Sequence, residues 1–241
     1  MKHVVMFSGG AASSVVAEMV ARRFPADTIL LHTPTYGEHP DADRFRAQVA
    51  AHIGLPITVA ADGRTIWELI RENRWFPNNL RGYCTETLKK RPAKRFLKAL
   101  GGPYTVYYGF GRDEAHRVLR QRLRYAQEGV EFQAPLHALQ IPDDFVFRVI
   151  RDDWKICLPE PYKYMTHNNC IPCYKAGMKH WYDVLTYYPD YYRKAVLLEI
   201  EIGRTMFKDI SLMSLAAKWA KDPPRGYEEK EQIPCMCANG L

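Results

Sequence analysis

The sequence has no long apolar run, no secretory signal pattern and no internal repeat. A membrane-spanning helix needs roughly 18 to 20 apolar residues, and no segment approaches that length, so we expect no membrane partner. Met1 leads into a strand-like pattern instead of a basic and then apolar stretch, which predicts a cytoplasmic protein. The lack of repeats and of low-complexity segments argues against a solenoid or a linker.

Cysteine is scarce, with six unevenly spaced residues. In a reducing compartment such thiols serve as ligands, nucleophiles or core residues more often than as disulfide partners, so a disulfide scaffold is not expected. Cys157 lies in an apolar setting between Ile156 and Leu158, and we expect it to be a buried structural residue.

The chain does contain enough apolar residues for a full core, since 47% of its 241 residues are hydrophobic. The formal charge of +7 favours an acidic partner. Basic residues gather in one segment (Lys89, Lys90, Arg91, Lys94, Arg95 and Lys98) and on one predicted helical face (Arg117, Arg120 and Arg124). Two interpretations remain open: a solvated face, or contact with a nucleotide phosphate or a nucleic-acid backbone.

Short apolar runs alternate with longer amphipathic runs in the first half, which predicts an α/β fold with a doubly wound, mostly parallel sheet. We expect strands at residues 3–7, 28–32, 57–60 and 105–110, and helices near 13–23, 41–53, 66–74 and 85–100. Pro92 should interrupt or begin the last of these helices.

After about residue 135 the pattern changes to short loops, followed by helical patterns near residues 175–188, 190–203 and 212–221. We therefore expect a nucleotide-binding α/β domain over residues 1–135. A helical, cysteine-bearing region over residues 136–241 should pack on it.

The segment from Phe7 to Ser14 predicts a strand that turns through two glycines into a helix. Gly9 and Gly10 let the backbone approach an anion, and the helix directs its positive end toward it. Hydroxyl donors come from Ser8, Ser13 and Ser14. The spacing matches neither a Walker A loop nor G-x-G-x-x-G, and a tight turn with no ligand is the alternative.

Ligands of parallel sheets bind beyond the carboxyl ends of the strands. Polar clusters follow three predicted strands: Ser8-Gly9-Gly10, His32-Thr33 and Gly109-Phe110-Gly111-Arg112-Asp113. One cleft should therefore collect all three clusters.

Cys170 and Cys173 form a C-x-x-C pair, a spacing at which two thiolates can hold one metal centre. Cys84 precedes a lysine-rich helix that favours the thiolate form, so it is a further candidate ligand. A zinc site completed by Cys235, Cys237, His167 or His180 and an iron-sulfur cluster both remain open. Cys235 and Cys237 are alternatively a nucleophile near the chain end or incidental thiols.

Three motifs in this order resemble the phosphoadenosine phosphosulfate (PAPS) reductase family of the adenine nucleotide alpha hydrolase superfamily, whose glycine loop is called the PP-loop. They are Phe7-Ser8-Gly9-Gly10-Ala11-Ala12-Ser13, His32-Thr33-Pro34-Thr35-Tyr36-Gly37-Glu38-His39-Pro40 and Cys84-Thr85-Glu86-Thr87-Leu88-Lys89-Lys90-Arg91-Pro92. The segment from Gly109 to Arg117 looks like the family's later Gly/Arg segment. The motif order is most similar to reductase-like proteins of bacteriophages and prophages, which also end in a short cysteine motif.

The resemblance implies a role for each matched position. Phosphate would be bound by Ser8, Gly9, Gly10 and Ser13, with Ser14 and Gly109 beside them. His32 and Thr33 would lie near the adenosine, and Arg112 and Arg117 would face the phosphate or sulfate end. A 4Fe-4S cluster would be held by Cys84, Cys170, Cys173 and Cys237, with Cys235 as the catalytic nucleophile.

Two positions depart from the family pattern. Ala12 stands where ATP pyrophosphatases usually carry Asp, which leaves the role of magnesium open. Cluster-bearing reductases have adjacent cysteines where this chain has Tyr83-Cys84.

Three functions are compatible with these motifs. The first is an oxidoreductase that uses a thiol reductant to reduce an adenylyl sulfate. The second is an ATP-dependent sulfurtransferase that moves sulfur from a donor to a base of RNA or DNA. The third is a nucleotide-binding or cluster-binding regulatory protein.

Overall fold

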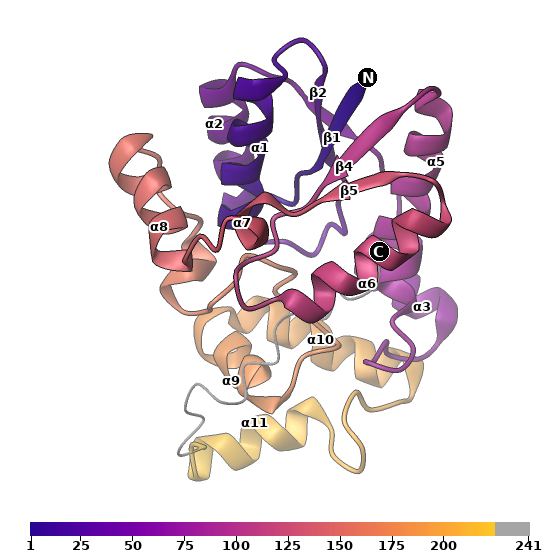
Figure 1. Ribbon diagram of the computed structural model, residues 1–241. Helices are drawn as coiled ribbons and strands as arrows, with labels where there is room; N and C mark the ends of the chain where they lie inside the picture. The colour runs from indigo at the N-terminus through magenta and orange to yellow at the C-terminus, as the bar shows by residue number, and fades with distance from the viewer. Residues whose placement is uncertain (225–241) are drawn as a thin grey trace.

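Five strands form one all-parallel sheet in the order β3-β2-β1-β4-β5 (Figure 1). The computed structural model describes residues 1–224. The strands are β1 (Lys2–Met6), β2 (Thr28–His32), β3 (Ile57–Val59), β4 (Tyr104–Tyr107) and β5 (Glu131–Gln133). The predicted α/β fold with a parallel sheet is confirmed. The edge strand β5 was not predicted, because its three residues carry no apolar run.

Alternating residues of the strands build a core on each face of the sheet. On one face, Val5 and Leu30 pack with α1 (Ala11–Arg23), α2 (Asp41–Ile53), α7 (Pro135–Ala138) and α8 (Asp143–Arg148). On the other face, Val4 and Val106 pack with α5 (Arg91–Leu100) and α6 (Ala115–Gln127). Both faces are thus covered, as parallel sheets require.

A third core lies beyond the carboxyl ends of the strands (Figure 1). It joins α3 (Ile66–Asn73) to α9 (Met178–Tyr187), α10 (Pro189–Ile202) and α11 (Leu212–Lys221) around the fully buried Trp181. The three C-terminal helices lie at the predicted positions, within three residues at each end. Among residues 1–224, no helix combines the length and apolar character needed to cross a bilayer.

The lysine-rich segment is helical from Tyr83 to Leu100 but changes its winding. A short helix, α4 (Tyr83–Thr85), continues into a π-helical turn (Glu86–Lys90) and then into α5. Pro92 stands in the first turn of α5, directly after the π-helical turn, so the change of winding comes next to the residue that has no backbone N–H. Such wide turns are frequent at functional sites.

The segment after residue 135 differs most from the prediction. Where loops were expected, α7 and α8 pack on the sheet, followed by a π-helical turn (Val149–Asp153) and a 3-10 helix (Glu160–Lys163). Cys157 was expected to be buried, and this was wrong: Ile156 takes the inward position and Cys157 is exposed.

Candidate functional site

The polar ends of β1, β2 and β4 meet in one cleft of about 730 Å³. Its wall contains eight of the predicted site residues: Ser8, Gly10, Ser13, His32, Thr33, Gly109, Arg112 and Arg117. Segments from the C-terminal half, including Tyr162 and residues 166–169, close the opposite side. The topology of the sheet brings the ends of β1, β2 and β4 together, because parallel strands end at the same edge of a sheet.

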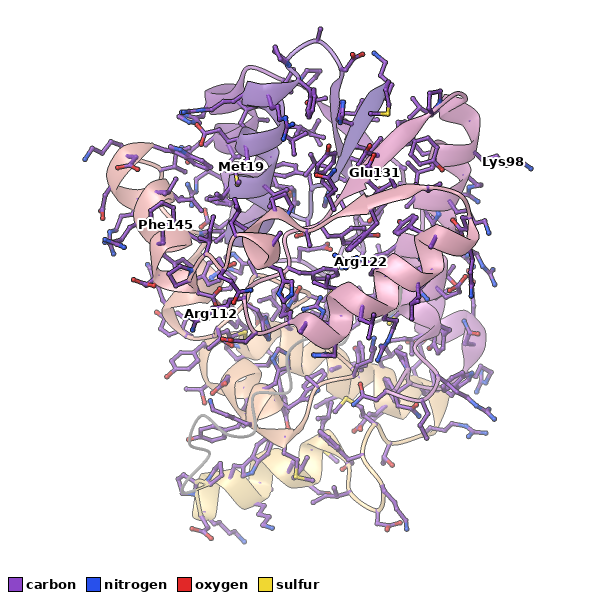
Figure 2. All side chains as sticks on the ribbon, viewed as in Figure 1. Met19, Lys98, Arg112, Arg122, Glu131 and Phe145 are labelled. Carbon is purple, nitrogen blue, oxygen red and sulfur yellow. The ribbon has the colours of Figure 1, made fainter. Side chains whose placement is uncertain are left out.

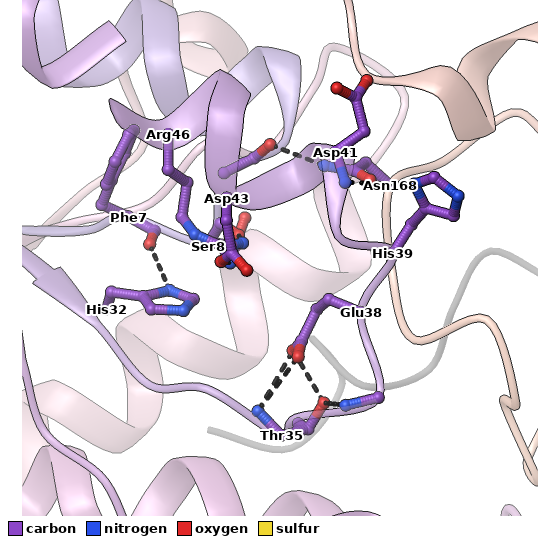
Figure 3. A network of polar contacts seen from close by, with 12 residues as sticks. Phe7, Ser8, His32, Thr35, Glu38, His39, Asp41, Asp43, Arg46 and Asn168 are labelled. Atoms are coloured by element: carbon purple, nitrogen blue, oxygen red, sulfur yellow. Dashed lines mark hydrogen bonds and ion pairs between the residues drawn. The ribbon is translucent and has the colours of Figure 1, made fainter. Parts of the chain in front are cut away.

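The glycine turn is held in shape from behind. Gly9 has φ +81°, and a Cβ there would lie 2.5 Å from Arg46 Cγ. The buried Arg46 forms an ion pair with Asp43 and donates a hydrogen bond to Ser8 O at 3.4 Å (Figure 3). Gly9 therefore shapes the loop and does not line the cleft.

The three serines of the turn have different roles. The hydroxyls of Ser13 and Ser14 both donate to Gly10 O, at 2.9 and 3.0 Å. Ser14 is fully buried, so its hydroxyl stabilises the start of α1 instead of facing a ligand. Ser8 Oγ lies 3.1 Å from Ser13 Oγ, and these two hydroxyls line the cleft.

Gly109 allows the end of β4 to touch the start of α1. A Cβ at this position would lie 2.5 Å from Ser13 N and 2.7 Å from Ala12 C, which are backbone atoms that cannot rotate away. The glycine turn and the later Gly/Arg segment are therefore in direct contact.

His32 is a buried, neutral hydrogen-bond acceptor. Its Nδ1 donates to Phe7 O at 3.1 Å, while Nε2 has no partner within residues 1–224 (Figure 3). Burial, and next the charge of Arg46, lower the pKa of His32 to about 4. At neutral pH the ring is uncharged, so Nε2 can accept a hydrogen bond from a ligand.

Glu38 is a second polar group of the cleft that the sequence did not reveal. Its carboxylate accepts hydrogen bonds from Thr35 N at 3.1 Å and from Thr35 Oγ1 at 2.7 Å (Figure 3). Burial alone would raise the pKa of Glu38, but the positive charge of Lys89 and the Thr35 hydrogen bonds lower it. Glu38 is therefore ionised beside a lysine that also lines the cleft.

The basic residues separate into inward and outward groups. Arg117 is buried, pairs with Glu114 and lies 4.6 Å from the Phe110 ring centroid, whereas Arg112 is exposed and pairs with Asp113. Arg120 is exposed and Arg124 is half-buried, so Arg117, Arg120 and Arg124 do not share one environment. Lys98 of α5 points outward from the molecule (Figure 2), Arg122 of α6 is exposed as well, and neither residue lines the cleft.

A small second cavity adjoins the cleft and gathers three of the predicted ligands: Cys84, Cys170 and Cys173. Lys89 borders both spaces. Cys170 Sγ lies 2.9 Å from Thr35 Oγ1, and Ile171 N donates to Gly37 O at 2.9 Å. The loop after β2 and the C-x-x-C segment are thus joined.

Only some of the predicted metal ligands lie within the residues that the structure describes. Within residues 1–224, no group of three or more His, Cys, Asp and Glu side chains is arranged to hold one ion. His180 Nε2 donates to Ile171 O at 2.8 Å, and its ring centroid lies 5.5 Å from that of His167. The proposed nucleophile Cys235 and the proposed ligand Cys237 lie outside the described residues.

Tyr162 and Asn168 contact the glycine turn from the C-terminal half. Tyr162 Oη accepts a hydrogen bond from Ala11 N at 3.0 Å, and Asn168 Nδ2 donates to Gly9 O at 2.9 Å. Asn168 lies two residues before the C-x-x-C pair, and this position was the only feature of the sequence that could have marked it as a residue of the site. Tyr162 had none.

Comparison with known proteins agrees with this geometry. A family model described as the phosphoadenosine phosphosulfate reductase domain matches residues 2–143, which is more than half of the chain. A comparison with curated proteins found no match. The matched range contains the glycine turn, the end of β2 and the Gly/Arg segment, whereas the C-x-x-C pair lies outside it.

Proposed function

The chain belongs to the phosphoadenosine phosphosulfate reductase family, and from that premise we propose that it reduces an adenylyl sulfate to sulfite in the cleft. Nucleotide-dependent sulfur chemistry is what the family match supports; the reaction itself is our proposal. The observation that carries it is the meeting of the glycine turn, His32 and Arg117 in one cleft next to a cavity lined by cysteines.

The binding roles follow from the chemistry of the residues that line the cleft. The hydroxyl of Ser8 and the N-terminal end of α1 face the nucleotide phosphate, and the hydroxyl of Ser13 can donate to it once it releases Gly10 O. Nε2 of neutral His32 accepts a hydrogen bond from the nucleoside. Arg117 and Lys89 place positive charge where the sulfate and the leaving phosphate carry negative charge.

We assign the chemical step to Cys235. Its thiolate attacks the sulfur of the adenylyl sulfate, an S–S bond forms, and the bond from sulfur to the phosphate oxygen breaks. The nucleotide leaves with that electron pair. A dithiol reductant then attacks the Cys235 sulfur, sulfite leaves, and the second thiol of the reductant frees Cys235 as the reductant becomes a disulfide.

The thiol side chains around the second cavity are of the chemistry that an iron-sulfur cluster or a zinc ion uses. A zinc ion needs all its ligands around one point, whereas the thiolates of a cluster bind separate iron atoms. Three described cysteines line this cavity, and Lys89 and Lys175 beside them offset the charge of thiolates. We propose that Cys84, Cys170, Cys173 and Cys237 hold a 4Fe-4S cluster, which would supply a redox-active centre next to the cleft.

The proposal is tested by sulfite release. Wild type, Cys235→Ser and Cys157→Ser are incubated with adenosine 5′-phosphosulfate, or with its 3′-phosphorylated form, and a dithiol reductant. We expect Cys235→Ser to lose all sulfite release and Cys157→Ser, whose thiol is exposed, to keep it.

Other outcomes favour the other functions. Cleavage of ATP to AMP in the presence of RNA or DNA, with neither adenylyl sulfate consumed, would favour the sulfurtransferase. Nucleotide binding without turnover in either assay would favour a regulatory role.

A further inference from the structure

Two leucines lie in the middle of the solvent-exposed face of α6. Leu119 and Leu123 are 57% and 59% exposed, whereas Val118 and Tyr125 on the opposite side of the helix pack into the core of the sheet. Residues four apart on a helix are neighbours on its surface, so the two leucines form one apolar patch. The other exposed residues of this helix are small or polar, and such a pair among them indicates a contact with another molecule.

Positive charge surrounds the leucine patch. At 100° per residue, Arg120 and Arg122 flank the leucines on opposite sides, and both arginines are exposed. Together with α5, which covers the same face of the sheet, α6 carries eight of the 34 Lys and Arg residues and no Asp or Glu. The 26 basic residues elsewhere nearly balance the 27 acidic residues of the chain, so the net positive charge arises from these two helices.

An apolar centre with a basic rim fits a protein better than a nucleic acid. Protein interfaces have an apolar core and a polar rim, and a positive rim favours an acidic partner. Nucleic acids are bound through their phosphates and through bases that stack on aromatic rings, and leucine offers neither a charge nor a ring. The exposed residues of α6 include no Phe, Tyr or Trp. The chemistry of this face therefore points to an acidic protein.

The leucine patch lies beside the cleft. Glu114 is the N-cap of α6 and Arg117 stands in its first turn, and both residues line the cleft. Leu119 follows Arg117 by two residues, which is about 3 Å along the helix axis. A protein bound to the patch would stand next to the site where the proposed reaction uses a dithiol.

We infer that this face of α6 is the docking site of the dithiol reductant and that this reductant is an acidic protein. The inference rests on the proposed function and names the partner of its second step. One thiolate of the docked protein attacks the Cys235 sulfur and sulfite leaves; the second thiolate then displaces Cys235, and the dithiol is oxidised to a disulfide. A single helix face gives a small interface, which suits a partner that must leave after each turnover.

The test compares two reductants, dithiothreitol and a thioredoxin of net negative charge, in sulfite release by wild type, Leu119→Ala/Leu123→Ala and Leu197→Ala. A small dithiol needs no docking surface, so the rate with dithiothreitol should stay within about twofold of wild type in both variants. The KM for thioredoxin should rise at least about tenfold in the double variant, because two apolar anchors are lost. Leu197, which is 58% exposed on α10 and does not line the cleft, is the matched control and should keep the wild-type KM.

The variant Arg122→Glu tests the charge of the rim separately. It should raise the KM for thioredoxin about three- to tenfold at about 50 mM salt, because it places a negative charge opposite an acidic partner. The difference from wild type should shrink at about 500 mM salt, since salt screens exposed charges. The rate with dithiothreitol should again match wild type.

The outcomes separate this inference from the proposed function. If wild type releases sulfite with neither reductant, the proposed function fails. Sulfite release with dithiothreitol but not with thioredoxin, or an unchanged KM for thioredoxin in the double variant, would overturn the docking site alone. Loss of the dithiothreitol rate in the double variant would also overturn it, because the leucines would then serve the fold of the chain itself. A wild-type dimer that the double variant dissociates would assign the patch to a second copy instead.

Discussion

At the scale of single residues, His32 combines a ring nitrogen open for a hydrogen bond with a free-energy cost of protonation that depends on pH. The ring is buried, its Nδ1 is engaged by Phe7 O, and Arg46 adds positive charge nearby. Protonation would place a second charge in a site that already disfavours it. The site therefore keeps the acceptor Nε2 available only while the ring is neutral.

This gives a prediction for stability. The pKa of His32 falls from 6.5 to about 4 on folding, so the unfolded chain binds the proton more readily between these values. The contribution of neutral His32 to the free energy of unfolding is fully present above pH 6.5 and is lost as the pH falls toward 4. Between pH 7 and 4.5 it amounts to about 2 to 3 kcal/mol.

Urea unfolding of wild type, His32→Gln and His116→Gln at about pH 7 and about pH 4.5 measures this contribution of His32 to stability. His32→Gln should lose less stability on acidification than wild type by that amount, whereas His116→Gln, at an exposed position, should match wild type. Equal pH dependence in all three proteins would contradict the prediction.

Some site residues were accessible from the sequence and others were not. Ser8, Ser13 and His32 belong to local patterns at strand ends, and the structure places them together in the cleft. Glu38 is held by hydrogen bonds from Thr35 close by in the chain, but the charge that keeps it ionised comes from Lys89, which lies on the π-helical turn far along the chain. A contact between distant segments leaves no local pattern, so sequence reasoning missed it.

At the scale of elements, the position of β4 against α1 depends on Gly109. Gly109→Ala places a methyl group 2.5 Å from Ser13 N, and the backbone on both sides must shift. Overpacking of this kind costs about 1 to 3 kcal/mol. We expect a lower melting temperature and AMP binding weakened by at least about tenfold, because the shift misplaces the donors of the glycine turn.

The matched control is Gly177→Ala. A Cβ at Gly177 meets no atom within 4 Å, and its φ of −80° suits any residue. Because Gly177 is the N-cap of α9, where Ala is less favourable than Gly, the melting temperature of this control should fall slightly while AMP calorimetry stays close to wild type. If Gly109→Ala behaved in the same way, the close contact of β4 with α1 would not be needed for the site.

The elements themselves were predicted where periodicity was strong. The bounds of α2 and α11 agree with the predicted ranges, because amphipathic runs with clear ends mark them. The helices α7 and α8 were missed, since they have four and six residues and stand among prolines. Exposure of Cys157 depends on how this short segment turns, which no local pattern specifies.

At the scale of the whole molecule, the C-terminal half completes a site that the parallel sheet begins. Asn168 bonds the glycine turn, and the β-bridge between Glu38 and Cys170 joins the loop after β2 to the C-x-x-C segment. The sequence predicted the cysteines as one set but not their place beside the cleft. Cys84 and the C-x-x-C pair are far apart in the chain but line the same cavity. Cys84 and Ile171 belong to the core in which α3 packs against α10, and this packing brings the cysteines together.

The last prediction concerns the cysteines that we propose as ligands of the cluster. Protein purified without oxygen should contain about four iron atoms and a similar amount of sulfide per chain, as a 4Fe-4S cluster requires. Cys170→Ser removes a sulfur from the shared cavity and should lose most of the iron, whereas Cys157→Ser, with an exposed thiol outside the cavity, should keep it. Iron, zinc and sulfide analysis of the three proteins decides the result. A colourless wild type that contains zinc would contradict the cluster, because the cysteines would then hold a different metal. Equal iron in Cys170→Ser and wild type would contradict its assignment to this cavity, because the ligands must then be other than the cysteines that the fold brings together.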